Sequence, residues 1–282
     1  MANPTFYTRP TDLETVKTLL REHPHALAIS GGGLTFSGVL LPYERVIDVQ
    51  AVPELQRIER LDGGVSIGAG VMLGRLLEIP ELPDVFRRAL TRCLPLNVRN
   101  NVSVMESFQQ RQHPLLREWH AALMAYDVLI DLFDPATGDC LRANLLHLAA
   151  RKRLESGLVL CVGLPFIQPA PFREAMGAAV VARTPAGEPL VNAAVYVALQ
   201  DGLVASVDAA VGGASAEPVT AVQLGQVLTN NPLNAANIAS AVKLVPLQLQ
   251  PVGDYKASAE YRREMARLCV GRALMECLEG VG

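Results

Sequence analysis

The chain has 282 residues, half of them hydrophobic, and a formal net charge of −3. This length suits two domains with a substantial core, and the near-neutral charge excludes the basic surface typical of nucleic-acid-binding proteins. The five cysteines include no Cys-x-x-Cys pair, which argues against a zinc or iron–sulfur site within the chain. Their odd number favours a reducing compartment over a disulfide framework. Because the N-terminus lacks a signal-peptide pattern and no apolar run reaches about 18 residues, we expect a cytoplasmic protein without a membrane span.

The first elements alternate short apolar runs with a helical pattern. Phe6-Tyr7 predicts a short strand, and Thr11 with Glu14 three residues later has the spacing of a capping box that begins a helix. Residues 26–29 predict a buried strand that leads directly into the turn Ser30-Gly31-Gly32-Gly33.

The following segments predict further strands and helices. Asp62-Gly63-Gly64, between two apolar runs, predicts a β-hairpin. A polar stretch at 97–112 separates two predicted helices. In chain order, the other expected elements are a strand at 46–49, helices at 84–94 and 114–126, and strands at 128–133 and 157–162.

Three prolines, Pro165, Pro169 and Pro171, mark the predicted domain boundary, because proline interrupts both helices and inner strands. We therefore divide the chain into domains at 1–165 and 172–282. The second domain is expected to hold a three-stranded antiparallel sheet at 178–183, 193–199 and 204–211, with turns at Pro185-Ala186-Gly187 and Asp201-Gly202. Helices are expected at 220–228 and 258–278, the latter with Tyr261, Met265, Leu268, Ala273 and Cys277 along one face.

The glycine turn after the strand at 26–29 is the first candidate binding site. Glycine allows positive φ and close approach of a ligand to the backbone, so consecutive amides of such a turn can bind an anion. The turn matches neither Gly-x-Gly-x-x-Gly nor a P-loop. A purely structural turn explains it equally well.

The order of the motifs along the chain resembles the flavin-binding subunit of the molybdenum hydroxylases, the family of aerobic carbon monoxide dehydrogenase and xanthine dehydrogenase. The similarity extends over almost the whole chain. The segments that carry it are Phe6-Tyr7-Thr8-Arg9-Pro10, Ser30-Gly31-Gly32, Val46-Ile47-Asp48-Val49, Pro53-Glu54-Leu55, Ile67-Gly68-Ala69, Gly212-Gly213 with Glu217-Pro218, and residues 254–263, which resemble the family's D-x-R-A-S-A-x-Y-R-R.

The resemblance implies an α+β fold with a two-part, PCMH-like FAD-binding domain, divided into subdomains at about 1–50 and 51–165. A smaller C-terminal domain with a three-stranded sheet and helices follows. It also implies FAD as cofactor, an iron–sulfur subunit and a molybdopterin large subunit as partners, and electron transfer from the iron–sulfur clusters through FAD to an acceptor. Molybdopterin and the clusters would lie only on the partners. The implied FAD-binding residues are Ser30, Gly31, Gly32, Gly33 and Leu34 in a first loop and Arg99, Ser103, Val104 and Ser107 in a second.

The second loop departs from the family pattern I-R-x-x-(G/A)-T-I-G-G-N. Met105 and Glu106 replace its two glycines, and Ser107 replaces the asparagine. A carboxylate about 4 Å from a phosphate charge would cost about 4 kcal/mol at an effective dielectric near 20. Val71-Met72 also stands where the family has two threonines.

Three alternatives follow from this departure. The subunit has lost FAD or binds it weakly and serves as a scaffold; it holds FAD through the first loop with a rearranged second loop; or it binds another ligand, such as a smaller nucleotide.

The other chemically interesting side chains have structural explanations. His113 and His120 lack a third metal ligand, and the acidic pairs Asp48/Glu54 and Asp131/Asp134 are expected to be solvated or capping residues. Cys161 and Cys269 are expected to lie in the core. The basic runs Arg87-Arg88 and Arg151-Lys152-Arg153 are expected to be solvated or, alternatively, to contact an acidic partner subunit.

Overall fold

The computed structural model describes residues 5–32, 43–150, 157–165, 173–182, 188–215, 217 and 219–281. The chain forms two compact units. Unit 1 comprises Met1–Leu82, Pro95–Gln110 and Val128–Phe166, and unit 2 comprises Pro83–Leu94, Arg111–Asp127 and Ile167–Gly282. Both units are therefore discontinuous in sequence, whereas the domain bounds 1–165 and 172–282 remain a prediction. The predicted turn at 185–187 and the basic cluster at 151–153 lie outside the described residues.

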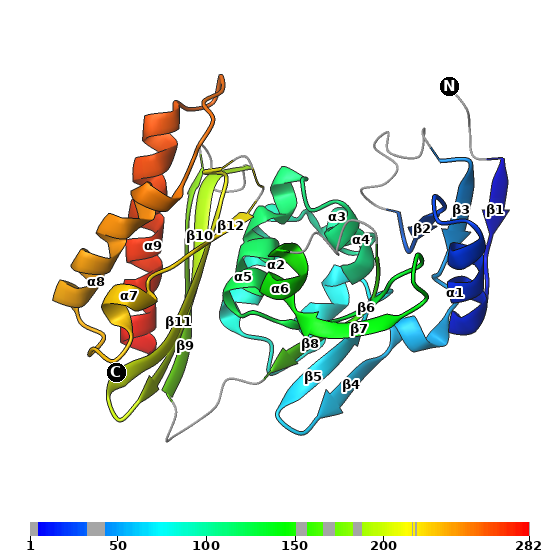
Figure 1. The fold of residues 1–282 in the computed structure, drawn as a ribbon, viewed down its shortest axis with the longest axis horizontal. Helices are drawn as coiled ribbons and strands as arrows, with labels where there is room; N and C mark the ends of the chain where they lie inside the picture. Colours follow the sequence, from blue (N-terminus) through cyan, green and yellow to red (C-terminus); the bar gives the residue numbers. More distant parts are fainter. Residues whose placement is uncertain are drawn as a thin grey trace. The chain divides into compact units, whose positions relative to one another are not determined.

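Unit 1 begins with a small parallel sheet in the order β1-β3-β2, formed by β1 (Phe6–Thr8), β3 (Arg45–Asp48) and β2 (Leu27–Ile29), with helix α1 (Leu13–Glu22) between β1 and β2 in sequence (Figure 1). The predicted N-cap Thr11 is wrong. Asp12 is the N-cap of α1, because its carboxylate accepts the Thr15 amide at 2.8 Å.

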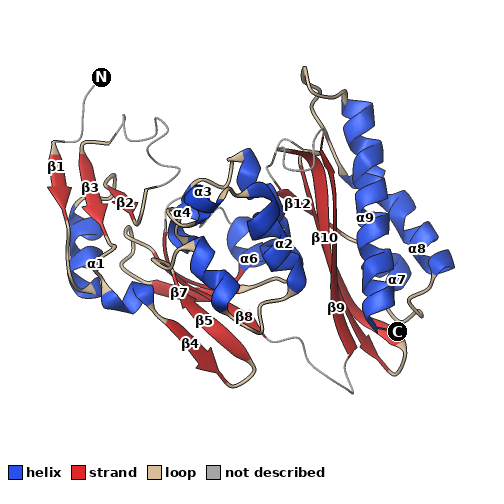
Figure 2. Ribbon diagram, turned by 180° about the vertical axis from the view of Figure 1, so that it is seen from behind, coloured by secondary structure: helices blue, strands red, loops and turns tan. Residues whose placement is uncertain are grey.

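A five-stranded antiparallel sheet forms the rest of unit 1 (Figure 2), in the order β4-β5-β8-β6-β7. The expected hairpin at Asp62-Gly63-Gly64 is confirmed, since it joins β4 to β5. The bounds are β4 (Ile58–Leu61), β5 (Gly64–Gly68), β6 (Leu129–Phe133), β7 (Cys140–Asn144) and β8 (Leu158–Pro165), with helices α3 (Leu96–Arg99), α4 (Val104–Gln109) and α6 (Leu145–Ala150). The polar stretch at 97–112 thus contains helix α4 and most of α3.

Unit 2 contains an antiparallel sheet of four strands, not the three expected, in the order β12-β11-β10-β9. Its strands are β9 (Arg173–Ala182), β10 (Pro189–Gln200), β11 (Leu203–Gly212) and β12 (Val219–Val222). The fourth strand takes the first three residues of the helix predicted at 220–228, of which only the short α7 (Gly225–Leu228) forms. Val219 and Val222 are buried at a spacing of three, which resembles a helical pattern.

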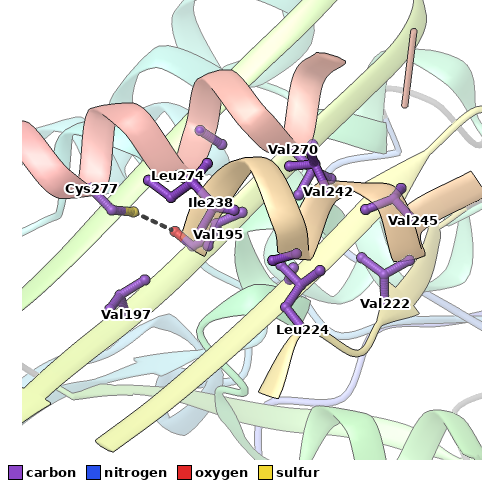
Figure 3. Close-up of a cluster of buried hydrophobic side chains, with 14 of the residues drawn as sticks. Val195, Val197, Val222, Leu224, Ile238, Val242, Val245, Val270, Leu274 and Cys277 are labelled. Carbon is purple, nitrogen blue, oxygen red and sulfur yellow. Dashed lines mark hydrogen bonds between the residues drawn. The ribbon is translucent and has the colours of Figure 1, made fainter. Parts of the chain in front are cut away.

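Helix α9 (Ala259–Val281) packs on β9 and β10, and α8 (Ala235–Ala241) contacts it (Figure 1). The core between α9 and the sheet consists of small aliphatic side chains such as Val195, Val197, Val270 and Leu274 (Figure 3). The Cys277 thiol donates to the carbonyl of Val195 at 3.6 Å. Helices α2 (Asp84–Cys93) and α5 (Arg117–Ala125) contact each other, and α5 also contacts β10 and β11.

The predicted buried face of the last helix is wrong at its start. Ala273 and Cys277 are buried as expected, but Tyr261 is 43% exposed, and the buried position in that turn is Arg262. The reason is that Nη1 and Nη2 of the guanidinium donate to acceptors inside unit 2, so a charged residue occupies a core position. Among the described residues, no helix combines the length and apolar character needed to cross a membrane.

Candidate functional site

The first loop follows directly from β2, as the sequence predicts. Ser30 is fully buried and Gly31 and Gly32 have φ of +91° and +76°. A Cβ on Gly31 would lie 2.4 Å from the carbonyl oxygen of Asn101, so only glycine fits there. Gly33 and Leu34 lie outside the described residues.

The Met72 side chain also lies close to this glycine. A Cβ on Gly31 would lie 2.9 Å from Cε and 3.1 Å from Sδ of Met72. The space that the glycine leaves free is therefore filled by a side chain of this protein. Met72 is the residue that stands at a family threonine position.

The second loop is held against the segment that carries Met72. Met72 and Ser103 form an isolated antiparallel bridge, and the Leu73 amide donates to the Val102 carbonyl at 2.8 Å. Ser103 is the N-cap of α4, because its hydroxyl accepts the Glu106 amide at 3.2 Å. The predicted site residues Ser103, Val104 and Ser107 therefore lie in the first turn of a short helix.

Every backbone amide from Val104 to Ser107 donates to an acceptor of this chain. The Val104 amide donates to Val71 O at 2.9 Å and the Met105 amide to Ala69 O at 2.7 Å. The Glu106 amide uses the Ser103 hydroxyl, and the Ser107 amide donates to Ser103 O at 3.0 Å. An anion-binding loop needs free N–H groups pointing at the ligand, and these four amides supply none.

The side chains of the second loop are also buried. Met105 is 1% exposed, Glu106 is fully buried, and the Ser107 hydroxyl donates to the Val104 carbonyl at 2.6 Å. A buried carboxylate at this place opposes a second negative charge. In the described arrangement, Ser103 to Ser107 do not fit the diphosphate of the FAD that the resemblance implies.

Hydrogen bonds join the elements and segments next to the two loops. The Gln109 side-chain amide donates to the Ala28 carbonyl at 2.8 Å, which ties α4 to β2. The Ser30 hydroxyl donates to the Gly70 carbonyl at 3.4 Å. Sequence reasoning missed Gln109 and Gly70, although the Val71-Met72 departure pointed to their segment.

Arg99, the remaining predicted site residue, ends α3 and is half-buried. Its Nε is buried without a hydrogen-bond partner among the described residues. Arg99 therefore lies near the second loop in sequence, but its guanidinium forms no bond to the described part of the first loop.

The family-like motifs at the start of the chain bind each other. Asp48 at the end of β3 is buried and accepts the Tyr7 hydroxyl of β1 at 2.5 Å, with Arg9 Nε at 3.5 Å. The hydrogen bond to this carboxylate raises the pKa of Tyr7. This cluster fastens β1 to β3 and presents no reactive group.

Asp131, Arg142 and Cys161 stand on adjacent strands of the five-stranded sheet. Arg142 binds the Asp131 carboxylate through Nε at 2.5 Å and Nη2 at 2.6 Å, and the Cys161 thiol lies 3.1 Å from Asp131 Oδ2. Burial, followed by this hydrogen bond, raises the pKa of Cys161 to about 11, so the thiol stays protonated. Cys161 is half-buried rather than a core residue, whereas Cys269 is buried as expected.

The two histidines have structural roles in α5 and in the turn before it. His113 Nδ1 accepts the Leu115 amide and caps the turn before α5, and His120 is buried within α5. Within the described ranges, no group of three His, Cys, Asp or Glu residues is arranged to hold a metal ion. Unit 2 has a cavity of about 30 Å³ beside Arg88, Arg92 and Asn192, which is far too small for a nucleotide.

Two family models match the chain. Residues 2–167 match the FAD binding domain in molybdopterin dehydrogenase, and residues 180–277 match the CO dehydrogenase flavoprotein C-terminal domain. No curated protein sequence matches it significantly.

Solved structures give the same fold. Carbon monoxide dehydrogenase from Hydrogenophaga pseudoflava, lacking the Mo-pyranopterin moiety of its cofactor, is 20% identical over 100% of both chains, with a TM-score of 0.81. Quinoline 2-oxidoreductase from Pseudomonas putida 86 is 20% identical over 100% of this chain and 99% of that chain (TM-score 0.78). Reconstituted CO dehydrogenase from Oligotropha carboxidovorans is 18% identical over 99% and 100% (TM-score 0.80). At these identities the structures show the fold alone. The two family models, which together span both parts of the chain, show that it belongs to the family of flavoprotein subunits of molybdopterin dehydrogenase complexes.

Proposed function

We propose that this chain is the medium subunit of a cytoplasmic, hetero-oligomeric molybdopterin dehydrogenase, in which it binds an iron–sulfur subunit and a molybdopterin large subunit. The observation that supports this most is the match of both family models, in the family's order, to 2–167 and 180–277. By the family resemblance, the substrate would be converted on the large subunit.

FAD would supply electron transfer between the iron–sulfur clusters and an acceptor. Because Ser103 to Ser107 do not fit the FAD diphosphate, we propose no electron-transfer step on this chain. The part that Ser30, Gly31 and Gly32 would play in binding FAD remains a prediction.

The test is to purify the affinity-tagged chain from its native host and to identify the copurifying proteins by mass spectrometry. We expect two further subunits, with iron and molybdenum detected in the same size-exclusion peak. An untagged strain is the control for unspecific capture. A folded chain that elutes alone, with neither metal, would contradict the proposal.

A second candidate is the flavin-dependent electron-transfer subunit of the same complex. It is favoured by the first loop, where a buried strand leads into two glycines with positive φ. Its signature is FAD bound at one molecule per chain in the isolated complex.

A further inference from the structure

The second loop is where the sequence departs from the family pattern, and the structure describes how its residues are bonded. In unit 1, the residues that would line an FAD diphosphate are instead bonded to each other. We infer that the chain closes this region with its own residues, chiefly Met72, Met105 and Glu106, and that it works in its complex without FAD. This inference rests on the family membership in the proposed function, but not on the proposed partners.

The first step of the argument concerns hydrogen-bond donors. The amides of Val104, Met105 and Ser107 donate to backbone carbonyls at 2.7 to 3.0 Å, and that of Glu106 donates to Ser103 Oγ. Phosphate oxygens would have to replace bonds that hold α4 to the segment at 69–73. Binding would therefore break existing structure, whereas a prepared anion site has its donors free.

The second step concerns space. Met105 is a fully buried side chain, where the family has a glycine that leaves room for the ligand. Met72 fills the volume beside Gly31, with Cε 2.9 Å from where a Cβ would stand. In the described part of the two loops, Met72 beside Gly31 and Met105 in α4 thus occupy the space. Replacing only Met72 or only Met105 would therefore free space in only one of the two loops.

The third step concerns charge. Glu106 is fully buried in the first turn of α4, at the position of the second family glycine. A carboxylate and a phosphate about 4 Å apart at an effective dielectric near 20 weaken binding by several hundred-fold. Glutamine at this position keeps the size and removes the charge, so it separates the two effects.

The fourth step concerns the connection between the loops. Gln109 holds the Ala28 carbonyl at 2.8 Å, and the Ser30 hydroxyl reaches the Gly70 carbonyl at 3.4 Å. These bonds join β2 to α4 and to the segment that carries Met72. These bonds hold the two loops and their neighbouring segments together within unit 1. They explain why the fold is stable without the cofactor.

The first experiment measures flavin in the complex as it is isolated, by acid release and by the visible flavin absorbance. We expect well under one FAD per chain, about 0.1 or less, both as isolated and after incubation with excess FAD. In a thermal-shift panel with FAD, FMN, ADP and NADH, the melting temperature should stay unchanged. Stoichiometric FAD in the wild type, or a rise in melting temperature with any of the four, would overturn the inference.

The second experiment opens the site in the full chain. The triple variant Met72→Thr/Met105→Gly/Glu106→Gly should bind FAD at least about 100-fold more tightly than the wild type, because the like charge and both fillers are gone. The matched control is Met275→Gly/Glu279→Gly, which makes similar changes at exposed positions of α9 and should gain nothing.

Glu106→Gln keeps the shape of the loop and answers the question if the triple variant does not fold. It should gain part of the affinity through charge alone. A folded triple variant, or a folded Glu106→Gln, with no gain in FAD affinity would show that these residues do not close the site. The proposed function and this inference can fail separately. A FAD-free complex with both partner subunits supports both of them. A FAD-loaded complex overturns only the inference, and a FAD-free chain without partners overturns only the proposed function.

Discussion

The C-terminal motif around Arg262 and the second loop around Glu106 both place a charged residue in the interior, but only the first keeps the residues of its family. In unit 2, Arg262 donates to the carbonyls of Leu190 and Gly213 at 2.8 Å and to both carboxylate oxygens of Asp254 at 2.9 Å. In unit 1, the loop residues have changed and their amides bond within the chain.

The comparison separates motifs that hold the fold from motifs that hold a ligand. The Asp254–Arg262 pair closes the turn before α9 and anchors that helix to β10 and to the end of β11. Its value to the fold does not depend on any cofactor. The two family glycines that Met105 and Glu106 replace serve a ligand. Their loss does not lower the stability of the fold once other side chains pack in their place.

The largest expected effect tests the first motif. Arg262→Ala should lower the free energy of unfolding by roughly 3–4 kcal/mol, because it removes the donor to the carbonyls of Leu190 and Gly213 and the charged partner of the Asp254 carboxylate. Chemical denaturation followed by circular dichroism measures this loss. Arg263→Ala on the same helix is the control and should change stability by less than about 0.5 kcal/mol. Equal losses in the two variants would contradict the anchoring role of Arg262.

The next effect tests whether the second loop is now part of the core. Met105→Ala should cost about 3 kcal/mol, the usual cost of truncating a buried methionine. Met275→Ala, at a position 39% exposed, should stay within about 0.5 kcal/mol. A site kept open for a ligand would tolerate the change at Met105, so a neutral result there would count against a closed loop.

Gly31→Ala should cost about 2 kcal/mol, since φ is +91° and the new Cβ would meet the Asn101 carbonyl. Gly202→Ala separates strain from collision. Gly202 has φ of +80° with open space around it, so about 1 kcal/mol of backbone strain remains. Thermal melting of both variants measures the difference. Identical losses would mean that the first loop is not packed against the segment at 101.

The sequence predicts the framework of the fold better than its closed loops. Alternation and turn residues locate the hairpin at Asp62-Gly63-Gly64 and the strand that precedes Ser30, because both signals are local. The edge strand β12 and the pair β7 and α6 were missed, since short segments carry too few residues to show a period. For this reason the sequence predicts three strands for the sheet of unit 2, whereas the structure has four.

The resemblance indicates a candidate site in the sequence, which stays a prediction, but the sequence does not show how the residues of that site are bonded. The resemblance implies that Ser30 and Ser103 belong to two loops of one FAD site, and the Met72–Ser103 bridge beside Gly31 brings their segments together. The full burial of Glu106 has no sequence signal, since glutamate normally lies at the surface. Only the backbone pairing of residues 69–73 with 102–105 reveals that the amides are used.

The smallest effect is a pH dependence of the C-terminal anchor. The hydrogen bonds from Arg262 lower the pKa of Asp254 to about 2, below its usual value near 4. A carboxyl group with a lowered folded-state pKa stabilises the protein above its unfolded pKa, and this stability is lost as pH falls from about 4 towards 2. Asp254 is 43% exposed, so solvent screening keeps the contribution below about 1 kcal/mol. The free-energy difference between wild type and Asp254→Asn should therefore be constant from pH 5 to 7 and shrink below about pH 4. A difference that stays unchanged to pH 2 would mean that the charge of Asp254 contributes nothing to holding Arg262, and the anchor would then resemble the second loop, whose stability comes from bonds to the backbone.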